Sequence, residues 1–188
     1  MYSHLHTLIT GMDLRANWDI VDAVEEQLAK PLGMKDWDIS LQEKDRNSTI
    51  SKYLAFPIWF STRDMARIGQ LMLNKGEWNK GQIISEHWVD EMLRHRTTSE
   101  EIDNNDPHFK DLDVSLGYGY MWWLFEDMDV PAFNNAYTAL GYPGQAIVVF
   151  PEKDIVPANK TKEIYQRCNS FPVRMALITK AVASLDPN

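Results

Sequence analysis

The chain has 188 residues, a formal net charge of −8 and a pI near 5.1. This length allows one domain with its own core, or one domain with an added lobe. The 44% hydrophobic and 11% aromatic residues predict a folded protein. The negative charge argues against nucleic acid or an anionic membrane surface as a partner. No apolar run approaches the roughly 18 residues that a membrane span needs.

Several common site types have no support in the sequence. Cys168 is the single cysteine, so no intrachain disulfide is expected, and a lone cysteine is most often inert. The chain has no HExxH or CxxC pattern, and neither of the glycine-rich phosphate loops. The acidic stretch 97–113 lacks the spacing of a calcium loop and is expected to be a solvated surface loop. We therefore expect no metal and no cofactor. No signal peptide is visible, so the compartment stays unknown.

Apolar residues at helical spacing predict four helices in the first half of the chain. They cover residues 3–14, residues 17–30 with Asn17 as the N-cap, a segment from Ser61 to Gly76, and a segment that begins after Ser85. Ser61 and Asp64 resemble a capping box. The expected inward faces are Met65, Ile68, Leu71 and Met72 in the third helix, and Trp88, Val89, Met92 and Leu93 in the fourth.

From residue 117 the pattern changes from helices to strands. Three strands are expected, GYGYMWWLF (117–125), NAYTALGY (135–142) and QAIVVF (145–150), and turn residues separate them. A closing helix is expected from residue 169 to 185, and its apolar face is Val173, Ala176, Leu177, Ile178, Ala181 and Val182. Helices followed by antiparallel strands and one last helix predict an α+β fold.

Five stretches, in chain order, resemble the serine β-lactamase-like hydrolases. This family includes class C β-lactamases, penicillin-binding proteins, and related esterases and amide hydrolases. The stretches are Tyr2-Ser3-His4 before a helix, AKPLGMKDW, STRDMARIGQLMLNKGEWNKGQIISEHWVDEM, YGYMWW and ALGYPGQAIVVFPEKD. The resemblance implies one partial domain over residues 1–188, with a helical lobe (1–116), then strands and a closing helix (117–188). It also implies that the family's N-terminal strands and catalytic helix are missing.

The resemblance also suggests where a site lies. Family members use a Ser-x-x-Lys pair, a Tyr-x-Asn box and a glycine-ended tripeptide on an inner strand. Tyr2 matches the box tyrosine, a proton-shuttle position, and His4 stands where asparagine is usual. Tyr142, Pro143 and Gly144 match the tripeptide, and Gln145 is typical of the esterase-like branch. From the residue types alone, Gly141 and Gly144 are predicted to be ordinary glycines of a hairpin turn. The resemblance instead implies that Tyr142–Gln145 line one wall of a substrate cleft.

The nucleophile motif is absent. None of the chain's serines is followed by lysine three residues later, and the nearest imitation is Thr49-Ile50-Ser51-Lys52. Without a lysine nearby, a tyrosine keeps a pKa near its reference of about 10 and is neutral at pH 7. We therefore expect the C-terminal fragment of a serine hydrolase that is inactive by itself. Its intact parent would act on a small ester or amide, or on a peptidoglycan-like substrate.

Two other interpretations remain open. The chain could be a non-catalytic binding or interaction module on the same scaffold, forming a homo-oligomer through a sheet edge that the missing strands leave uncovered. It could also be an unrelated α+β domain. Substrate identity does not follow from the fold, because one scaffold serves lactamases, peptidases and esterases. Asn159-Lys160-Thr161 resembles a His-Lys-Thr sequence that some family members carry after the strand, but the resemblance implies no role for it, and Lys160 is expected to be exposed.

Overall fold

A computed structural model describes residues 19–42, 58–102, 114–126, 131–141, 144–160, 177–178 and 180–182. The chain divides into two compact units, Met1–Arg67 and Ile68–Asn188, which are described separately. The predicted helix at residues 3–14 lies outside the described residues. No helix in the described part of the chain is both long and apolar enough to span a membrane.

Helix α2 (Ile20–Val24) belongs to the first unit. Its N-cap is Asp19, whose side chain accepts a hydrogen bond of 2.9 Å from the Val21 N–H. Asp19 has an extended backbone, so the helix begins later than the predicted residue 17. A π-helical turn (Glu25–Ala29) continues it, and a 3₁₀ turn (Ile39–Leu41) follows further along.

Helix α3 (Thr62–Leu73) begins and ends where the sequence predicts. The Ser61 hydroxyl oxygen accepts a hydrogen bond of 3.1 Å from the Asp64 N–H, as expected for an N-cap. At the other end, the Gly76 N–H donates to the Leu71 carbonyl at 2.8 Å. Three of the four residues predicted to face inward are buried: Met65, Leu71 and Met72.

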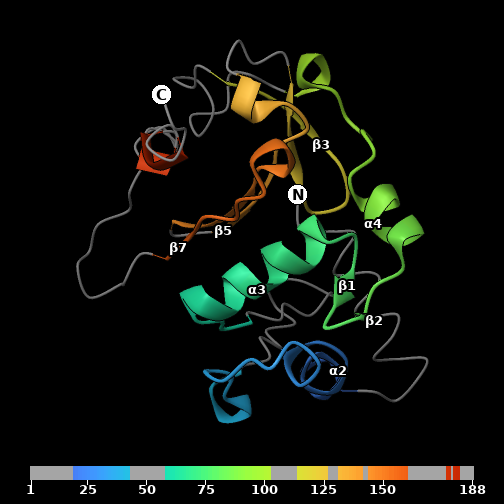
Figure 1. Ribbon diagram of the computed structural model, residues 1–188, viewed down its shortest axis with the longest axis vertical. Coiled ribbons are helices and arrows are strands. Elements are labelled where there is room, and N and C mark those ends of the chain that lie inside the picture. Colours follow the sequence, from blue (N-terminus) through green and yellow to red (C-terminus); the bar gives the residue numbers. More distant parts are fainter. Residues whose placement is uncertain are drawn as a thin grey trace, which may run out of the picture. The chain divides into compact units, whose positions relative to one another are not determined.

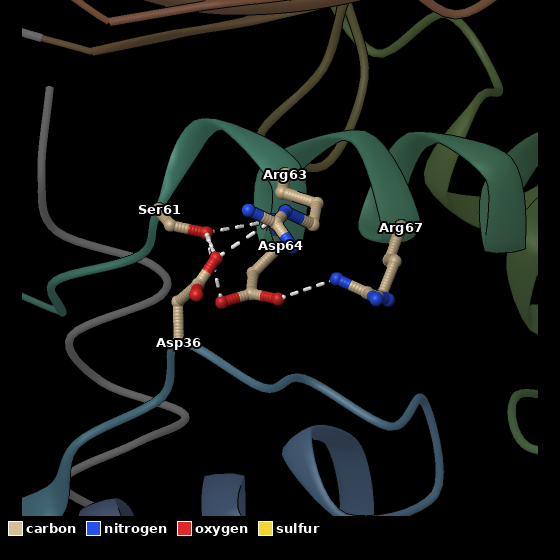
Figure 2. Close-up of polar contacts among 5 residues, drawn as sticks. All are labelled: Asp36, Ser61, Arg63, Asp64 and Arg67. Carbon is tan, nitrogen blue, oxygen red and sulfur yellow. Dashed lines mark hydrogen bonds and ion pairs between the residues drawn. The ribbon is translucent and has the colours of Figure 1, made fainter.

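A polar cluster joins the start of α3 to the loop that carries Asp36 (Figure 2). Asp64 is fully buried, and its carboxylate accepts from Arg67 Nη1 at 2.8 Å and from the Ser61 hydroxyl at 2.9 Å. The Ser61 hydroxyl also lies 2.8 Å from Asp36 Oδ2, which is 3.5 Å from Arg63 Nε. A buried carboxylate is tolerated only when it is paired in this way, so the cluster links the loop to the helix.

The second unit contains a two-stranded hairpin and helix α4 (Glu86–Met92). The hairpin pairs β1 (Glu77–Trp78) with β2 (Gly81–Gln82). The prediction that Trp88 faces inward is wrong, because its side chain is 42% exposed whereas the next residue, Val89, is fully buried. Consecutive residues on a helix lie about 100° apart, so a short helix that buries Val89 turns Trp88 toward solvent.

This unit also contains a five-stranded antiparallel sheet with the order β3-β4-β5-β6-β7. Figure 1 labels β3, β5 and β7 of this sheet. The strands are β3 (Ser115–Tyr118), β4 (Trp123–Glu126), β5 (Tyr137–Gly141), β6 (Gln145–Val149) and β7 (Ala158–Asn159). The helices and the antiparallel sheet confirm the predicted α+β class. The single strand predicted at 117–125 is wrong, because the chain turns at residues 119–122, where the Gly119 N–H donates to the Trp122 carbonyl at 2.9 Å.

Side chains of β6 are buried on both faces of this sheet. Ala146 and Val148 belong to a core cluster that also contains Ile178 and Val182 from the C-terminal residues. Ile147 points the other way, where a Cβ on Gly69 of α3 would lie 2.7 Å from its Cγ2 atom. Glycine at position 69 thus lets the helix approach the sheet closely. The continuous apolar run of β6 follows from this two-sided burial.

The closing helix is described only at residues 177–178 and 180–182, which are helical. Ile178 and Val182 face the core as predicted, and they are four residues apart, one turn of a helix. Leu177 is 60% exposed and Ala181 is exposed, so the prediction that these two face inward is wrong. In the described part of this helix, the buried face therefore contains Ile178 and Val182 but not all the apolar residues predicted for it.

Replacing Asp64 tests the buried cluster. Asp64→Ala is expected to lower the free energy of unfolding by about 2–4 kcal/mol, because it leaves the Arg67 guanidinium without its carboxylate partner and removes one of the two acceptors near the Ser61 hydroxyl. Asp90→Ala is the matched control, since its ion pair with Lys75 joins side chains that are 51% and 53% exposed. This change should cost under about 1 kcal/mol. Urea denaturation measures both, and equal midpoints would contradict the assignment.

Candidate functional site

The residues matched to the family's tripeptide lie at the end of the β5–β6 hairpin. Gly141 pairs with Gln145, and the Gly144 N–H donates to the Gly141 carbonyl at 3.0 Å, which closes a tight turn. Gly144 has φ of +124°, a backbone conformation that a residue with a side chain rarely adopts. Turn geometry is therefore sufficient reason for glycine at this position. Tyr142 and Pro143 lie outside the described residues.

Two side chains flank this turn. Gln145 is half-buried. A Cβ atom added to Gly141 would lie 3.0 Å from the Gln145 side-chain oxygen, so the Gln145 side chain lies close to the Gly141 backbone. Asn159, at the end of β7, donates from Nδ2 to the Gly144 carbonyl at 3.1 Å. The other amide atom, Asn159 Oδ1, is buried, and no described residue forms a hydrogen bond with it. The hairpin end thus carries a glycine with a fixed carbonyl and an amide on either side.

The structure places only part of the predicted site. Gly144 and Gln145 lie together at the hairpin end, whereas Tyr2 and His4 are outside the described residues. Asn159 was not predicted as a site residue, because the likeness of Asn159-Lys160-Thr161 to a His-Lys-Thr sequence of the family implied no role for it. Only the pairing of β6 with β7 brings it near Gly144. Lys160, expected to be exposed, is half-buried.

Neither Tyr118, which is half-buried, nor Tyr137, which is buried, resembles an activated proton acceptor. Burial raises the pKa of the Tyr118 hydroxyl and, more strongly, that of Tyr137. A higher pKa keeps the phenol neutral at pH 7, so neither side chain can serve as a base. Tyr137 instead packs edge-on against Trp122, at 5.3 Å between ring centroids, and Trp122 is 6% exposed.

The Ser61 hydroxyl is fixed by hydrogen bonds to its neighbours, but these neighbours are unsuited to activating a nucleophile. Its hydroxyl faces the carboxylates of Asp36 and Asp64 (Figure 2). The oxygens of these two carboxylates already take part in contacts with Ser61, Arg63 and Arg67. Arginine is a hydrogen-bond donor with no acceptor atom, so Arg67 cannot take the serine proton. The cluster is therefore structural.

A carboxylate–imidazole pair that the sequence did not suggest joins the segment after α4 to strand β4. His95 Nδ1 lies 2.7 Å from Glu126 Oε1, and the second oxygen accepts from the Ser99 N–H at 3.1 Å. Oε1 gains a hydrogen bond only when Nδ1 carries a proton. A Cβ on Gly117 would lie 2.1 Å from Oε1, so this glycine makes room for the pair. Among the described residues no three His, Cys, Asp or Glu side chains group as metal ligands.

Comparison with solved structures identifies the fold. The chain is similar to a protein from Bacillus anthracis provisionally named a 6-aminohexanoate-dimer hydrolase, with a TM-score of 0.59 and 19% identity over 96% of this chain and 42% of that one. It is also similar to a protein from Bacteroides dorei provisionally named a β-lactamase, with a TM-score of 0.55 and 15% identity over 93% of this chain and 55% of that one. The chain has a β-lactamase-like fold, as its sequence predicts.

These likenesses have defined limits. The chain spans 42% and 55% of the two solved chains, about half their length. No protein-family model matches the sequence, and no curated protein is significantly similar to it. The likeness to the solved structures therefore rests on how the backbone is arranged, and it extends over nearly the whole of this chain.

Replacing Gly144 tests the strained turn. Gly144→Ala is expected to lower the free energy of unfolding by about 1–3 kcal/mol, because a side chain at φ of +124° is strained. Gly81→Ala is the control. A Cβ there would be 3.5 Å from its nearest neighbour, the Trp78 carbonyl oxygen, so the change should be within about 0.5 kcal/mol of neutral. If both variants unfold at the same urea concentration, Gly144 does not have the strained backbone.

Proposed function

We propose that this chain forms the C-terminal part of a serine hydrolase of the β-lactamase-like class. Residues Tyr142–Gln145 would line one wall of its substrate cleft. The observation that carries the proposal is the hairpin end itself. A glycine with a fixed carbonyl stands at the start of a strand buried on both faces, where the family resemblance expects the glycine-ended tripeptide. The shared fold supports this placement.

The reaction we infer is acyl transfer through serine. A serine hydroxyl attacks the carbonyl carbon of an ester or amide, and its proton passes to a lysine or tyrosine base. The leaving group takes a proton and departs, and water then hydrolyses the acyl-serine. In this scheme Tyr2 occupies the proton-shuttle position, while His4 and Tyr142–Gln145 contact the substrate. The serine and lysine would come from residues outside these 188, because no Ser-x-x-Lys occurs within them.

Substrate class follows from the chemistry only broadly. The same acyl-serine route serves lactams, linear amides, esters and peptidoglycan-like peptides. Gln145, typical of the esterase-like branch, favours open-chain esters or amides over lactams. The provisional name of the Bacillus anthracis protein, a hydrolase of a linear amide, is in keeping with this preference. We therefore place small open-chain esters and amides first.

The 188-residue chain should not turn over p-nitrophenyl acetate, nitrocefin or 6-aminohexanoate dimer above buffer at pH 7, because it lacks the paired nucleophile and base. The DNA that precedes the Met1 codon should encode Ser-x-x-Lys in frame. The longer product should hydrolyse the acetate, and alanine in place of that serine should remove the activity. Serine-dependent turnover by the 188 residues alone, or a longer product without activity, would refute the proposal.

Tyr2 can be tested in the form that hydrolyses p-nitrophenyl acetate. Tyr2→Phe should lower kcat by roughly 10²–10⁴, the usual contribution of a general acid–base group. Tyr120→Phe serves as the control, because Tyr120 is 39% exposed on the β3–β4 turn and has no part in the proposed site. A Tyr2→Phe enzyme with unchanged kcat and pH profile would remove Tyr2 from the mechanism.

A second candidate is a non-catalytic interaction module, favoured by an exposed aromatic group on the second unit. Trp88 stacks on Tyr120 at 5.9 Å between ring centroids, and the Arg96 guanidinium lies 4.6 Å from the Tyr120 ring. Trp88, Tyr120 and Met121 are each about 40% exposed. Exposed apolar groups of this kind often mark contact surfaces.

The sheet edges make a weaker case for a homo-oligomer. At one edge, Tyr118 of β3 already pairs with Thr97, and at the other edge β7 is a two-residue strand. Both features leave little free strand edge for pairing with a second copy.

A dimer formed through the exposed aromatic group should have a mass of twice 21.8 kDa in light scattering, and Trp88→Ala should restore the single-chain mass. A single-chain mass at every concentration would exclude this alternative.

A further inference from the structure

The Asn159 side chain joins two strands at the proposed substrate wall. Asn159 pairs with Ala146, and Gly144 lies two residues before Ala146, so Asn159 and Gly144 are diagonal neighbours on one face of the sheet. Nδ2 of Asn159 donates to the Gly144 carbonyl at 3.1 Å. This bond fixes the carbonyl from the β7 side, while β5 holds the other side of the strand through the Gly141–Gln145 pair.

This hydrogen bond contributes little net stability to the fold. The second amide atom, Oδ1, is buried and has no hydrogen-bond partner among the residues that the structure describes. The penalty for a buried, unpaired acceptor is as large as the net gain from one ordinary hydrogen bond, or larger. A leucine has nearly the same shape as asparagine and would avoid the penalty. Stability alone therefore does not account for asparagine here, and its effect on the Gly144 carbonyl does.

Thr138 provides a comparison within the same hairpin. Its hydroxyl donates to the Ile147 carbonyl at 2.9 Å, and the side chain is fully buried. The two bonds are of the same kind, each running from a side chain to a carbonyl of the β6 segment. They differ in place, because Thr138 acts inside the sheet and Asn159 acts at the turn.

We propose that Asn159 is a positioning residue for the hydrolytic site, an inference that rests on the proposed function. It fixes the peptide plane between Gly144 and Gln145. Since carbonyl and N–H point in opposite directions across a trans peptide, holding the Gly144 carbonyl toward β7 directs the Gln145 N–H toward β5. The peptide between Gly144 and Gln145, next to the proposed substrate contacts, is then held from both neighbouring strands.

The test compares Asn159→Leu with Thr138→Val. In the 188-residue chain, Asn159→Leu should keep the melting temperature within about 2 °C of the wild type or raise it. The same change should speed exchange of the Gln145 amide hydrogen, followed by ¹⁵N NMR, by about tenfold. Thr138→Val should lower the melting temperature and leave that exchange rate, measured well below the melting transition, close to the wild-type value.

The second part of the test measures kinetics. It uses the 188-residue chain or the longer product, depending on which of the two hydrolyses p-nitrophenyl acetate. Asn159→Leu should lower kcat by roughly 10–100-fold with a smaller change in KM, as expected when reacting groups are misplaced. Thr138→Val should keep kcat per folded molecule. Wild-type exchange and kcat in Asn159→Leu would overturn the inference, and so would equal losses in both variants, which indicate a general effect on the sheet.

The two arms separate this inference from the proposed function. A wild-type protein with no turnover in either form contradicts the proposed function, and the exchange arm then decides whether Asn159 orders the turn. An active wild type with an unaffected Asn159→Leu variant contradicts the inference alone. Faster exchange together with a lower kcat supports both.

Discussion

The pairing of β5 with β6 is the interaction on which the second unit depends. These strands are in register from Tyr137–Val149 to Gly141–Gln145, and the residues of β6 after Gln145 are buried on both faces. One face meets the cluster that includes Ile178 and Val182, and the other meets the close approach of α3 at Gly69. Because a shift of one residue would exchange the two faces, burial on both sides fixes the register of the hairpin and the place of its turn.

The fixed register of β5 and β6 also fixes the position of the turn at the end of this hairpin. Sites built on strands are held more exactly than sites built on free loops, since the strands carry their own hydrogen-bond network. Gly144 closes the turn to Gly141, and Asn159 holds its carbonyl from β7. Three strands therefore converge on one peptide, an arrangement suited to presenting backbone groups to a substrate.

Sequence patterns predicted the elements whose local signals agree with their packing. Helix α3 has a capping serine and an apolar stripe, and β6 is a short apolar run, so both were predicted closely. Residues 117–125 read as one strand because aromatic residues continue across the turn, where Met121 adopts a φ of +68° without the usual glycine. Trp88 was misassigned because hydrophobicity does not say which side of a short helix is covered. Asn159 and the His95–Glu126 pair depend on partners distant in sequence, which no local pattern reveals.

The glycine at the turn does not by itself distinguish a substrate wall from an ordinary hairpin. Its φ of +124° would select glycine in either case. The buried Asn159 Oδ1 is more informative, because a fold selected only for stability has no use for an unpaired acceptor. Glu126 Oε1 is the instructive contrast, since His95 can satisfy it by carrying a proton on Nδ1. In the described part of the chain Asn159 Oδ1 has no such partner, and the amide's other contribution is the hydrogen bond to Gly144. The costly group thus lies beside the peptide that the proposed chemistry needs to be fixed, which is where natural proteins most often give up stability for function.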